Sequence, residues 1–305
     1  MRFNVVCFGA LNMDKLHRVN RIAREDEESF IIDLKERPGG SAANTAVGLA
    51  RLGLRVGFIG KVAEDREGRL LLKDFRDEEV DTTGVVVSKQ GRSGGVMGYV
   101  DRKGERALYV DPGVNDSLES GEINLEYAKN TEFLHLTSFV ADTPFHAQKD
   151  SLENLPDVKV SFDPGELYAR RGLDSLKPLI RRSYVMFPNE HEVRLLTGRS
   201  YKKGSEVLLN EGARIVVATL GRRGCYITNG GENHLVEPSE VEVVDTTGAG
   251  DAFCAGFLYG LIKGRGLRDC GRMGNLVASC CLREVGAREG LPKISTLEKH
   301  RQLQY

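Results

Sequence analysis

The run Asp245-Thr-Thr-Gly-Ala-Gly-Asp251 constrains this sequence more than any other feature. It follows Val241–Val244, a β-branched segment that predicts a strand, and it precedes Ala252–Ile262, an apolar segment typical of a buried helix. The small residues 248–250 let a ligand approach the backbone closely. The unpaired N–H groups at the start of the helix and the positive end of its dipole then favour an anion. The run therefore predicts a phosphate site.

Asp251 lies in the first turn of that predicted helix and has two interpretations. A carboxylate there interacts favourably with the helix dipole, which requires no further function. Alternatively, Asp251 is a base beside the bound phosphate, where it takes a proton from an attacking hydroxyl.

The letters D-T-T-G-A-G-D-A-F from residue 245 closely resemble the C-terminal signature of the ribokinase-like sugar kinases, the phosphofructokinase-B family. Gly39-Gly-Ser-Ala-Ala-Asn44 is similar to the N-terminal glycine signature of that family, and the likeness extends from about residue 4 to about 295. The resemblance implies one α/β kinase domain over residues 1–305, with a small β-sheet lid formed by roughly 10–37 and 92–110.

Hydrophobic periodicity gives the same fold class independently. Short apolar segments such as Phe3–Phe8 and Phe133–Leu136 alternate with helical segments such as Leu173–Arg182. This alternation predicts a doubly wound, mostly parallel central sheet flanked by helices. Two strand pieces, near 29–35 and 96–110, do not fit the alternation and indicate a small separate sheet. So few strands are unstable alone, so this sheet must lean on something else.

The composition excludes several other classes of protein. The 305 residues include 43 basic and 44 acidic side chains, so no excess of positive charge indicates a nucleic acid or membrane partner. No apolar run is long enough to span a bilayer, and the N-terminus enters a strand directly. The six cysteines form no C-x-x-C pair, which favours free thiols. We expect a cytoplasmic enzyme.

The acceptor site is predicted near the end of the first strand, where open α/β sheets bind ligands. Asn12 and Asp14 follow that strand, and the resemblance implies that Asp14 accepts hydrogen bonds from substrate hydroxyls. Gly39, Gly40 and Asn44 complete the predicted site, although Asn44 equally suits a helix cap. Ribokinases usually carry Lys where this chain has Ser41, which leaves sugars other than ribose open.

The nucleotide site is predicted in the second half of the chain. Asn189 and Glu192 have the spacing of a capping box, and the resemblance implies that the same pair helps to place Mg²⁺ through water. Thr219, Gly221 and Gly224 match the family's T-x-G-x-x-G turn. Asn275 matches a family position near the nucleotide, but it also suits a buried cap.

The resemblance implies ATP as the donor, with Asp251 as the base and the N–H groups of Gly248, Ala249 and Gly250 around the transferred phosphoryl group. The resemblance also suggests, as a hypothesis only, a potassium site built from backbone carbonyls. The predicted potassium ligands are Asp245, Thr247, Cys281, Glu284, Gly286 and Gly290. No G-x-x-x-x-G-K-[ST] sequence is present, so a P-loop kinase is excluded. The resemblance further implies a homodimer formed through the lid.

The function predicted is transfer of the γ-phosphoryl group of ATP to a hydroxymethyl of a sugar. A nucleoside kinase of the same family is the alternative, with base stacking on Phe139, Phe162 and Tyr168. A sugar-phosphate kinase would need a basic cluster at the acceptor end. Candidates for that cluster are Lys35, Arg37, Arg92 and Arg106.

The sequence disfavours two classes of protein outside the kinases. A nicotinamide dehydrogenase would share the architecture, but Gly9–Asp14 lacks its G-x-G-x-x-G fingerprint. A catalytically silent binding protein is disfavoured by the presence of Asp251 together with every glycine of its loop.

Overall fold

The computed structural model describes residues 2–103, 105–238 and 240–297. The larger of its two sheets has nine strands in the order β13-β12-β11-β10-β9-β8-β1-β4-β5. Their bounds are β1 Phe3–Phe8, β4 Val56–Ala63, β5 Val80–Ser88, β8 Thr131–Thr137, β9 Lys159–Asp163, β10 Ser183–Met186, β11 Val216–Thr219, β12 Cys225–Thr228 and β13 Asn233–Val236. All pairs from β5 to β11 are parallel, whereas β12 and β13 form an antiparallel edge. The predicted doubly wound, mostly parallel sheet is confirmed.

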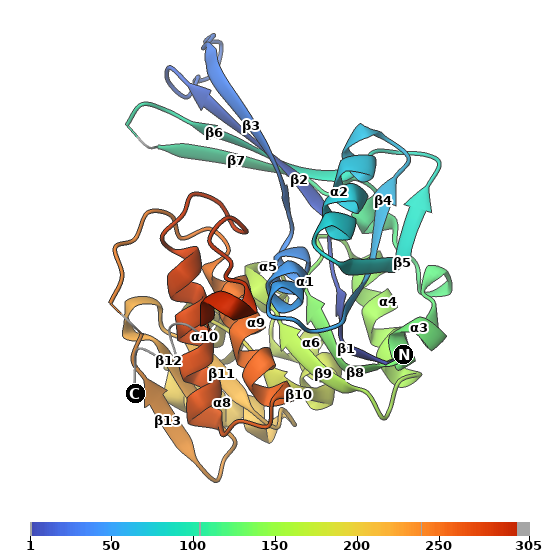
Figure 1. Cartoon of the computed structure of the whole chain (residues 1–305), viewed down its shortest axis with the longest axis vertical. Coiled ribbons are helices and arrows are strands. Elements are labelled where there is room, and N and C mark those ends of the chain that lie inside the picture. The colour runs from blue at the N-terminus through green and yellow to red at the C-terminus, as the bar shows by residue number, and fades with distance from the viewer. Residues whose placement is uncertain (1, 104, 239, 298–305) are drawn as a thin grey trace.

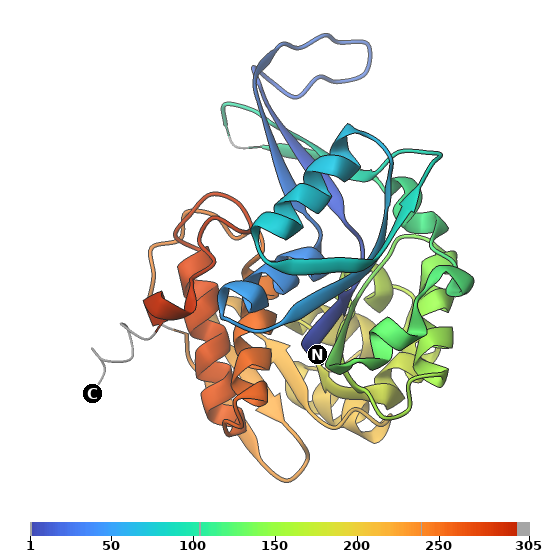
Figure 2. The same ribbon diagram turned by 45° about the vertical axis from the view of Figure 1, so that its right-hand side comes forward.

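Helices cover both faces of this sheet (Figures 1 and 2). Strand β1 shows why, because Val5 and Cys7 point into one hydrophobic cluster and Val6 and Phe8 into the other. Cores therefore form on both sides, with α1, α2, α9 and α10 on one face and α4, α6, α7 and α8 on the other. The helices are α1 Ser41–Arg51, α2 Arg66–Asp77, α3 Leu125–Lys129, α4 Asp142–Glu153, α5 Gly165–Ala169, α6 Leu173–Arg182, α7 Glu190–Thr197, α8 Tyr201–Asn210, α9 Ala249–Ile262 and α10 Leu267–Cys281.

The smaller sheet has four strands in the order β3-β2-β6-β7 and extends away from the main body (Figure 1). Its strands are β2 Asn12–Val19, β3 Ile31–Gly39, β6 Gly94–Val100 and β7 Arg106–Asp111. Strand β2 pairs with β3 so that Asn12 lies opposite Gly39 and Asp14 opposite Arg37. The base of this sheet, hereafter the lid sheet, therefore brings the predicted acceptor residues together.

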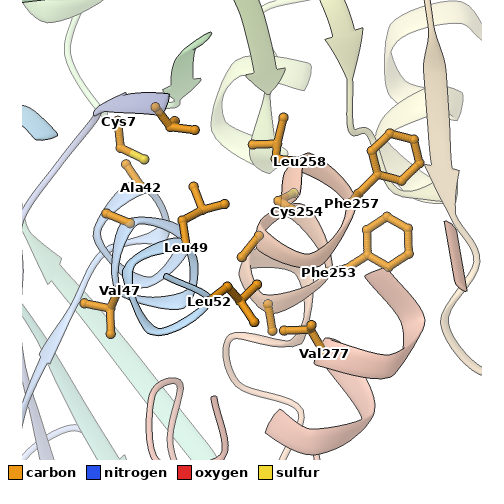
Figure 3. Close-up of a cluster of buried hydrophobic side chains, with 14 of the residues drawn as sticks. Cys7, Ala42, Val47, Leu49, Leu52, Phe253, Cys254, Phe257, Leu258 and Val277 are labelled. Carbon is orange, nitrogen blue, oxygen red and sulfur yellow. The ribbon is translucent and has the colours of Figure 1, made fainter. Parts of the chain in front are cut away.

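Helices α1 and α9 lie in close contact, and this contact positions the site (Figure 3). Small residues allow the approach, because a Cβ added at Gly48 would lie 2.8 Å from the Cβ of Ala255. Larger side chains such as Leu49 and Leu258 then fill the space around that contact. Since α1 begins at Ser41 and α9 at Ala249, both helices place polar residues of their first turns at one end of this interface.

One predicted strand is wrong. Residues Val241–Val244 form no strand, and the side chains of Val243 and Val244 are exposed. The N–H of Val244 donates to the carbonyl of Leu282 over 2.8 Å, so this segment is held by the end of α10. Its β-branched residues fit the local pattern of a strand, but the segment pairs with no strand among the residues that the structure describes.

Candidate active site

The start of α9 presents backbone donors toward open space. Gly248 is the N-cap residue with φ +75°, and a Cβ there would lie 2.6 Å from the Cβ of Ala287, so both conformation and space require glycine. The Ala249 N–H contacts the Thr246 carbonyl at 3.3 Å, whereas no bond from the N–H of Gly250 to a backbone carbonyl is found in the described ranges. A Cβ at Gly250 would meet nothing within 4 Å. This helix start therefore suits an anion, with Gly250 as its most open donor.

Asp251 is only partly exposed and is fixed from α1. Asn44 Nδ2 donates to Asp251 Oδ2 over 2.8 Å, and Thr45 Oγ1 contacts the Asp251 carbonyl at 3.3 Å. Burial raises the pKa of the Asp251 carboxyl to about 7, and the negative charge of Asp163 acts in the same direction. The hydrogen bond from Asn44 and the charge of Arg288 oppose that rise. A carboxyl that titrates near neutral pH can accept a proton and release it again.

The predicted acceptor residues lie together at the base of the lid sheet. Asp14 Oδ1 is buried and has no hydrogen-bond partner among the described residues. Burial raises the pKa of Asp14 to about 6, while the charge of Arg288 lowers it. A Cβ at Gly39 would collide with the Asp14 carboxylate, and one at Gly40 with the Ala10 carbonyl. Gly39 therefore makes room for a carboxylate whose free oxygen suits a ligand hydroxyl.

Asn12 is oriented by a residue that the sequence did not single out. The buried Asn115 donates from Nδ2 to Asn12 Oδ1 over 3.0 Å and to the Leu11 carbonyl over 2.9 Å. Its Oδ1 accepts from the Leu11 N–H over 3.0 Å. Because the oxygen of Asn12 is engaged in this way, its amide nitrogen remains as the donor for a ligand.

Asn44 has a different setting from a simple helix cap. The cap of α1 is Gly40, which makes no side-chain hydrogen bond. The side chain of Asn44 instead bridges two charged groups, because its Oδ1 accepts from Arg288 Nε over 2.8 Å while its nitrogen donates to Asp251. Arg288 was not predicted, since nothing in the letters Gly-Ala-Arg-Glu-Gly signals a buried charge.

The nucleotide residues line a cavity of about 970 Å³ that adjoins the start of α9. The predicted members Thr219, Gly221, Gly224 and Asn275 all lie on its wall, as does Gly250. Asn275 donates from Nδ2 to the carbonyls of Val236 and Glu237, at 3.1 and 3.0 Å. Its amide therefore holds the loop beside the cavity, which agrees with the buried-cap interpretation.

Asn189 and Glu192 form the expected capping box at the start of α7. Both Glu192 oxygens accept from Asn189, from its N–H over 2.9 Å and from Nδ2 over 2.7 Å. Burial, followed by the charge of Asp163, raises the pKa of Glu192 to about 8. A cation beside Glu192 would favour its ionised form, and a single carboxylate that reaches Mg²⁺ through water is enough for such a site.

One of the carbonyls predicted to bind potassium, that of Thr247, is in contact with the thiol of Cys281. Cys281 Sγ lies 3.5 Å from the carbonyl oxygens of Thr247 and of Ala287. The Asp245 carboxylate accepts from Thr247 and from the N–H of Gly286, and the Cys281 carbonyl accepts from Glu284 over 3.3 Å. Gly290 packs against the Cys280 carbonyl. Of the six predicted carbonyls, those of Thr247 and Cys281 thus already face a donor of the chain itself.

The aromatic residues predicted to stack on a nucleobase are misplaced for that role. Phe139, Phe162 and Tyr168 are all at most 1% exposed and belong to the core beneath the sheet. Tyr168 directs its hydroxyl to Gln148 over 3.0 Å. These rings pack in the hydrophobic core, so the prediction that they stack on a nucleobase is wrong.

The basic cluster predicted for a sugar phosphate is largely neutralised. Arg37 pairs with Glu289 at 3.0 Å, and Arg92 pairs with Asp111. Lys35 is exposed, with no ion pair recorded for it in the described ranges. The side chain of Arg106 lies outside the described residues.

Similar proteins were found by sequence and by structure. The family model for "pfkB family carbohydrate kinase" matches residues 2–294. A protein of Archaeoglobus fulgidus described as an uncharacterized sugar kinase is 45% identical over 81% of this chain and 99% of its own. An ATP-dependent ribose-1-phosphate kinase of Halopiger xanaduensis is 34% identical over 83% of each chain. The crystal structure of a Thermotoga maritima ribokinase superposes with a TM-score of 0.89 at 23% identity, covering 98% of this chain and 99% of that one.

Proposed function

The chain belongs to the pfkB family of carbohydrate kinases, and from that premise we propose that it transfers the γ-phosphoryl group of ATP to a hydroxymethyl of a sugar. It is a sugar kinase and hence a phosphotransferase with an alcohol acceptor. The observation that carries the finer proposal is Asp251, a carboxyl with a pKa near 7 beside the open N–H of Gly250.

Asp251 takes the proton of the acceptor hydroxyl as that oxygen attacks the γ-phosphorus. The P–O bond to ADP breaks as the new P–O bond forms, and ADP leaves with the electron pair. The N–H groups of Gly248, Ala249 and Gly250 stabilise the negative charge on the phosphoryl oxygens, and Gly250 is the most exposed of the three residues. This arrangement acts mainly through position and charge.

The acceptor is held by Asp14 and Asn12, beside Gly39, Gly40 and Asn44. Asp14 offers an unpartnered oxygen to a hydroxyl, and Asn12 offers its amide nitrogen. These two groups bind adjacent hydroxyls of a sugar, which orients the hydroxymethyl group toward Asp251. The lid sheet excludes water that would otherwise compete as the acceptor.

The donor lies in the cavity lined by Thr219, Gly221 and Gly224. Mg²⁺, when bound, neutralises charge on the phosphate oxygens. Glu192 and Asn189 would hold it through water. We assign no step to potassium, because the Cys281 thiol already contacts the Thr247 carbonyl.

We propose that two copies associate through the lid sheet. Apolar side chains are concentrated and exposed on β3 and β7 and next to them, where a soluble monomer rarely leaves them uncovered. They are Phe30, Ile31, Ile32, Leu34, Leu108, Tyr109 and Val110. Sedimentation of the wild-type chain and of Ile32→Glu tests this, since only the former should sediment as a dimer.

A sugar phosphate is the second candidate acceptor. The Halopiger relative that is named a ribose-1-phosphate kinase supports it, and Lys35 offers an exposed cation on the lid sheet. The pairing of Arg37 and Arg92 with acids counts against a larger basic site. ADP release with D-ribose, D-fructose, adenosine and ribose 1-phosphate distinguishes these acceptor classes.

The test of the proposed mechanism is Asp251→Asn. This variant should keep its fold and its ATP affinity but lose about 10²- to 10⁴-fold in turnover, the usual contribution of a general base. Asp269→Asn is the matched control, because Asp269 is an exposed acid in the first turn of α10. It should retain full turnover. Turnover of Asp251→Asn close to that of the wild type would reduce Asp251 to a helix-dipole partner.

A further inference from the structure

Arg288 is a buried cation that the mechanism above does not use. It follows α10 in the segment that packs against the start of α9, and it is only 7% exposed. Its guanidinium contacts three different parts of the chain: Asn44 of α1, Asp74 of α2 and, at 3.5 Å, the carbonyl of Gly39 at the end of β3. A charge this deeply buried is costly unless its partners satisfy it.

The contact between Arg288 and Asn44 determines which way the amide of Asn44 points. Arg288 Nε can only donate, so the atom that faces it at 2.8 Å must be the Asn44 oxygen. The amide nitrogen then faces Asp251 Oδ2, at 2.8 Å. The reversed amide would set its NH₂ against the guanidinium and its oxygen against the carboxylate, which is unfavourable at both ends.

We propose that Arg288 is a positioning residue for phosphoryl transfer: by fixing the Asn44 amide, it holds the Asp251 carboxylate in place for the acceptor hydroxyl. This inference rests on the proposed role of Asp251 as the base. Each nitrogen of its guanidinium already faces a group of the chain, namely Asn44, Asp74 or Gly39, so we assign it no contact with the reacting atoms.

The guanidinium is itself held rigidly. Asp74 accepts from its Nη1, and the ring of Phe75 lies 5.8 Å from it. Arg51 donates to the backbone carbonyl of Arg288 over 2.5 Å and forms a two-point ion pair with Glu78. A lysine would keep the charge opposite Asp74 but could not direct a second donor to Asn44 from a planar group.

Several charged groups surround Asp251, so its titration tests the proposal. Asp163 at the end of β9 raises the pKa of Asp251, whereas Arg288 and the donors of Asn44 and Ser41 lower it. The thiols of Cys254 and Cys281 also face it, and both remain protonated because burial raises their pKa. Loss of Arg288 removes a positive charge near Asp251 and lets the Asn44 amide turn away from the Asp251 carboxylate. Both changes should raise the pKa of Asp251.

The experiment compares Arg288→Met with Arg288→Lys. Arg288→Met should lower kcat about 10- to 100-fold, the scale expected for a misplaced group, leave the ATP Kd within about twofold and move the acid limb of the pH profile about one unit upward. Arg288→Lys should keep the limb near its wild-type position but still lose kcat about tenfold. Rates are measured with the best acceptor of the panel above. Carboxyl ¹³C NMR of Asp251 gives the same pKa comparison without any acceptor.

Arg182→Met is the matched control for loss of a hydrogen-bonded arginine. Arg182 donates to the carbonyls of Leu155, Pro156 and Val158, far from the site, so its loss should lower Tm and leave kcat unchanged. If Arg288→Met does not fold, Arg288→Lys decides the outcome through kcat. Wild-type kcat and an unmoved Asp251 pKa in Arg288→Met would overturn the inference, while an inactive Asp251→Asn would leave the proposed mechanism intact.

Discussion

The acceptor end and the nucleotide end of the site are built in different ways. At the acceptor end, buried and half-buried polar side chains bond to one another across four segments, as in the series Asp74, Arg288, Asn44 and Asp251. At the nucleotide end, a cavity of about 970 Å³ is walled largely by turns and apolar residues, including η3 at Gly221–Arg223. The acceptor end selects its ligand through side chains held in fixed positions, whereas the nucleotide end selects its ligand through the shape of the cavity and through backbone groups. Equivalent substitutions should therefore have unequal effects at the two ends.

Gly40→Ala and Gly221→Ala compare the two ends directly, and the first should have the largest effect on stability. Both glycines have positive φ, +101° and +58°. A Cβ at residue 40 also collides with the Ala10 carbonyl, whereas one at residue 221 meets nothing within 4 Å. Strain plus overpacking should cost Gly40→Ala about 3–5 kcal/mol of unfolding free energy, and strain alone should cost Gly221→Ala about 1–2 kcal/mol. Urea denaturation measures both.

Equal losses from the two substitutions would show that the acceptor end is no more tightly packed than the nucleotide end. Gly198→Ala provides the baseline, because its φ is +67°, a Cβ there meets nothing within 4 Å, and it caps α7 outside the cavity. It should match Gly221→Ala in stability, and its kinetics should stay those of the wild type.

Asp14→Asn should have the next largest effect, and it should weaken only the use of the acceptor and not the binding of ATP. The substitution keeps the shape but removes the charge from the unpartnered oxygen, and hydrogen bonds to charged groups contribute about 1.5–3 kcal/mol. We expect kcat/KM for the acceptor to fall about 10- to 150-fold. The KM for ATP should stay within about twofold, since Asp14 lies outside the nucleotide cavity.

Thr219→Val is the converse substitution at the nucleotide end. Thr219 lines the cavity, and its N–H already donates to the Pro188 carbonyl, so the change removes only a hydroxyl. It should raise the KM for ATP less than about tenfold and leave the acceptor KM unchanged. A large effect of Asp14→Asn on ATP binding would mean that the two ends do not act separately.

The same contrast explains what the sequence could predict. The central sheet was predictable because its strands are buried on both faces and read as continuous apolar segments, as Phe3–Phe8 does. Strand β2 was missed because its letters, Asn-Met-Asp-Lys-Leu-His-Arg-Val, alternate poorly in a sheet that is largely exposed. Val241–Val244 has the β-branched residues of a strand but pairs with no other strand in the described parts of the chain. Pairing is a property of the whole fold, which one segment does not encode.

The candidate site divides along similar lines. Asn44 and Asp251 were identified because they lie in glycine-rich signatures, and Asp14 because it follows the end of the first strand. The structure brings all three close to Arg288. Arg288 carries no such mark, since only the packing of the segment after α10 against α1 and α2 buries it. The aromatic residues led to the opposite error, because Phe139 was predicted to stack on a nucleobase but is a core residue.

The smallest expected effect is the pH dependence, and it sharpens the comparison because only the acceptor end should control it. Burial raises the pKa of Asp251 to about 7, and a base acts only when it is unprotonated. With Mg²⁺ and ATP saturating, kcat/KM for the acceptor should therefore be constant above that pH and fall about tenfold per unit below it. Thr219→Val should move neither the plateau nor the limb, because its effect on ATP binding disappears when ATP is saturating. A limb near pH 4, the ordinary value of an exposed aspartate, would mean that the bound acceptor and ATP leave Asp251 well solvated, and that its burial contributes nothing to its basicity.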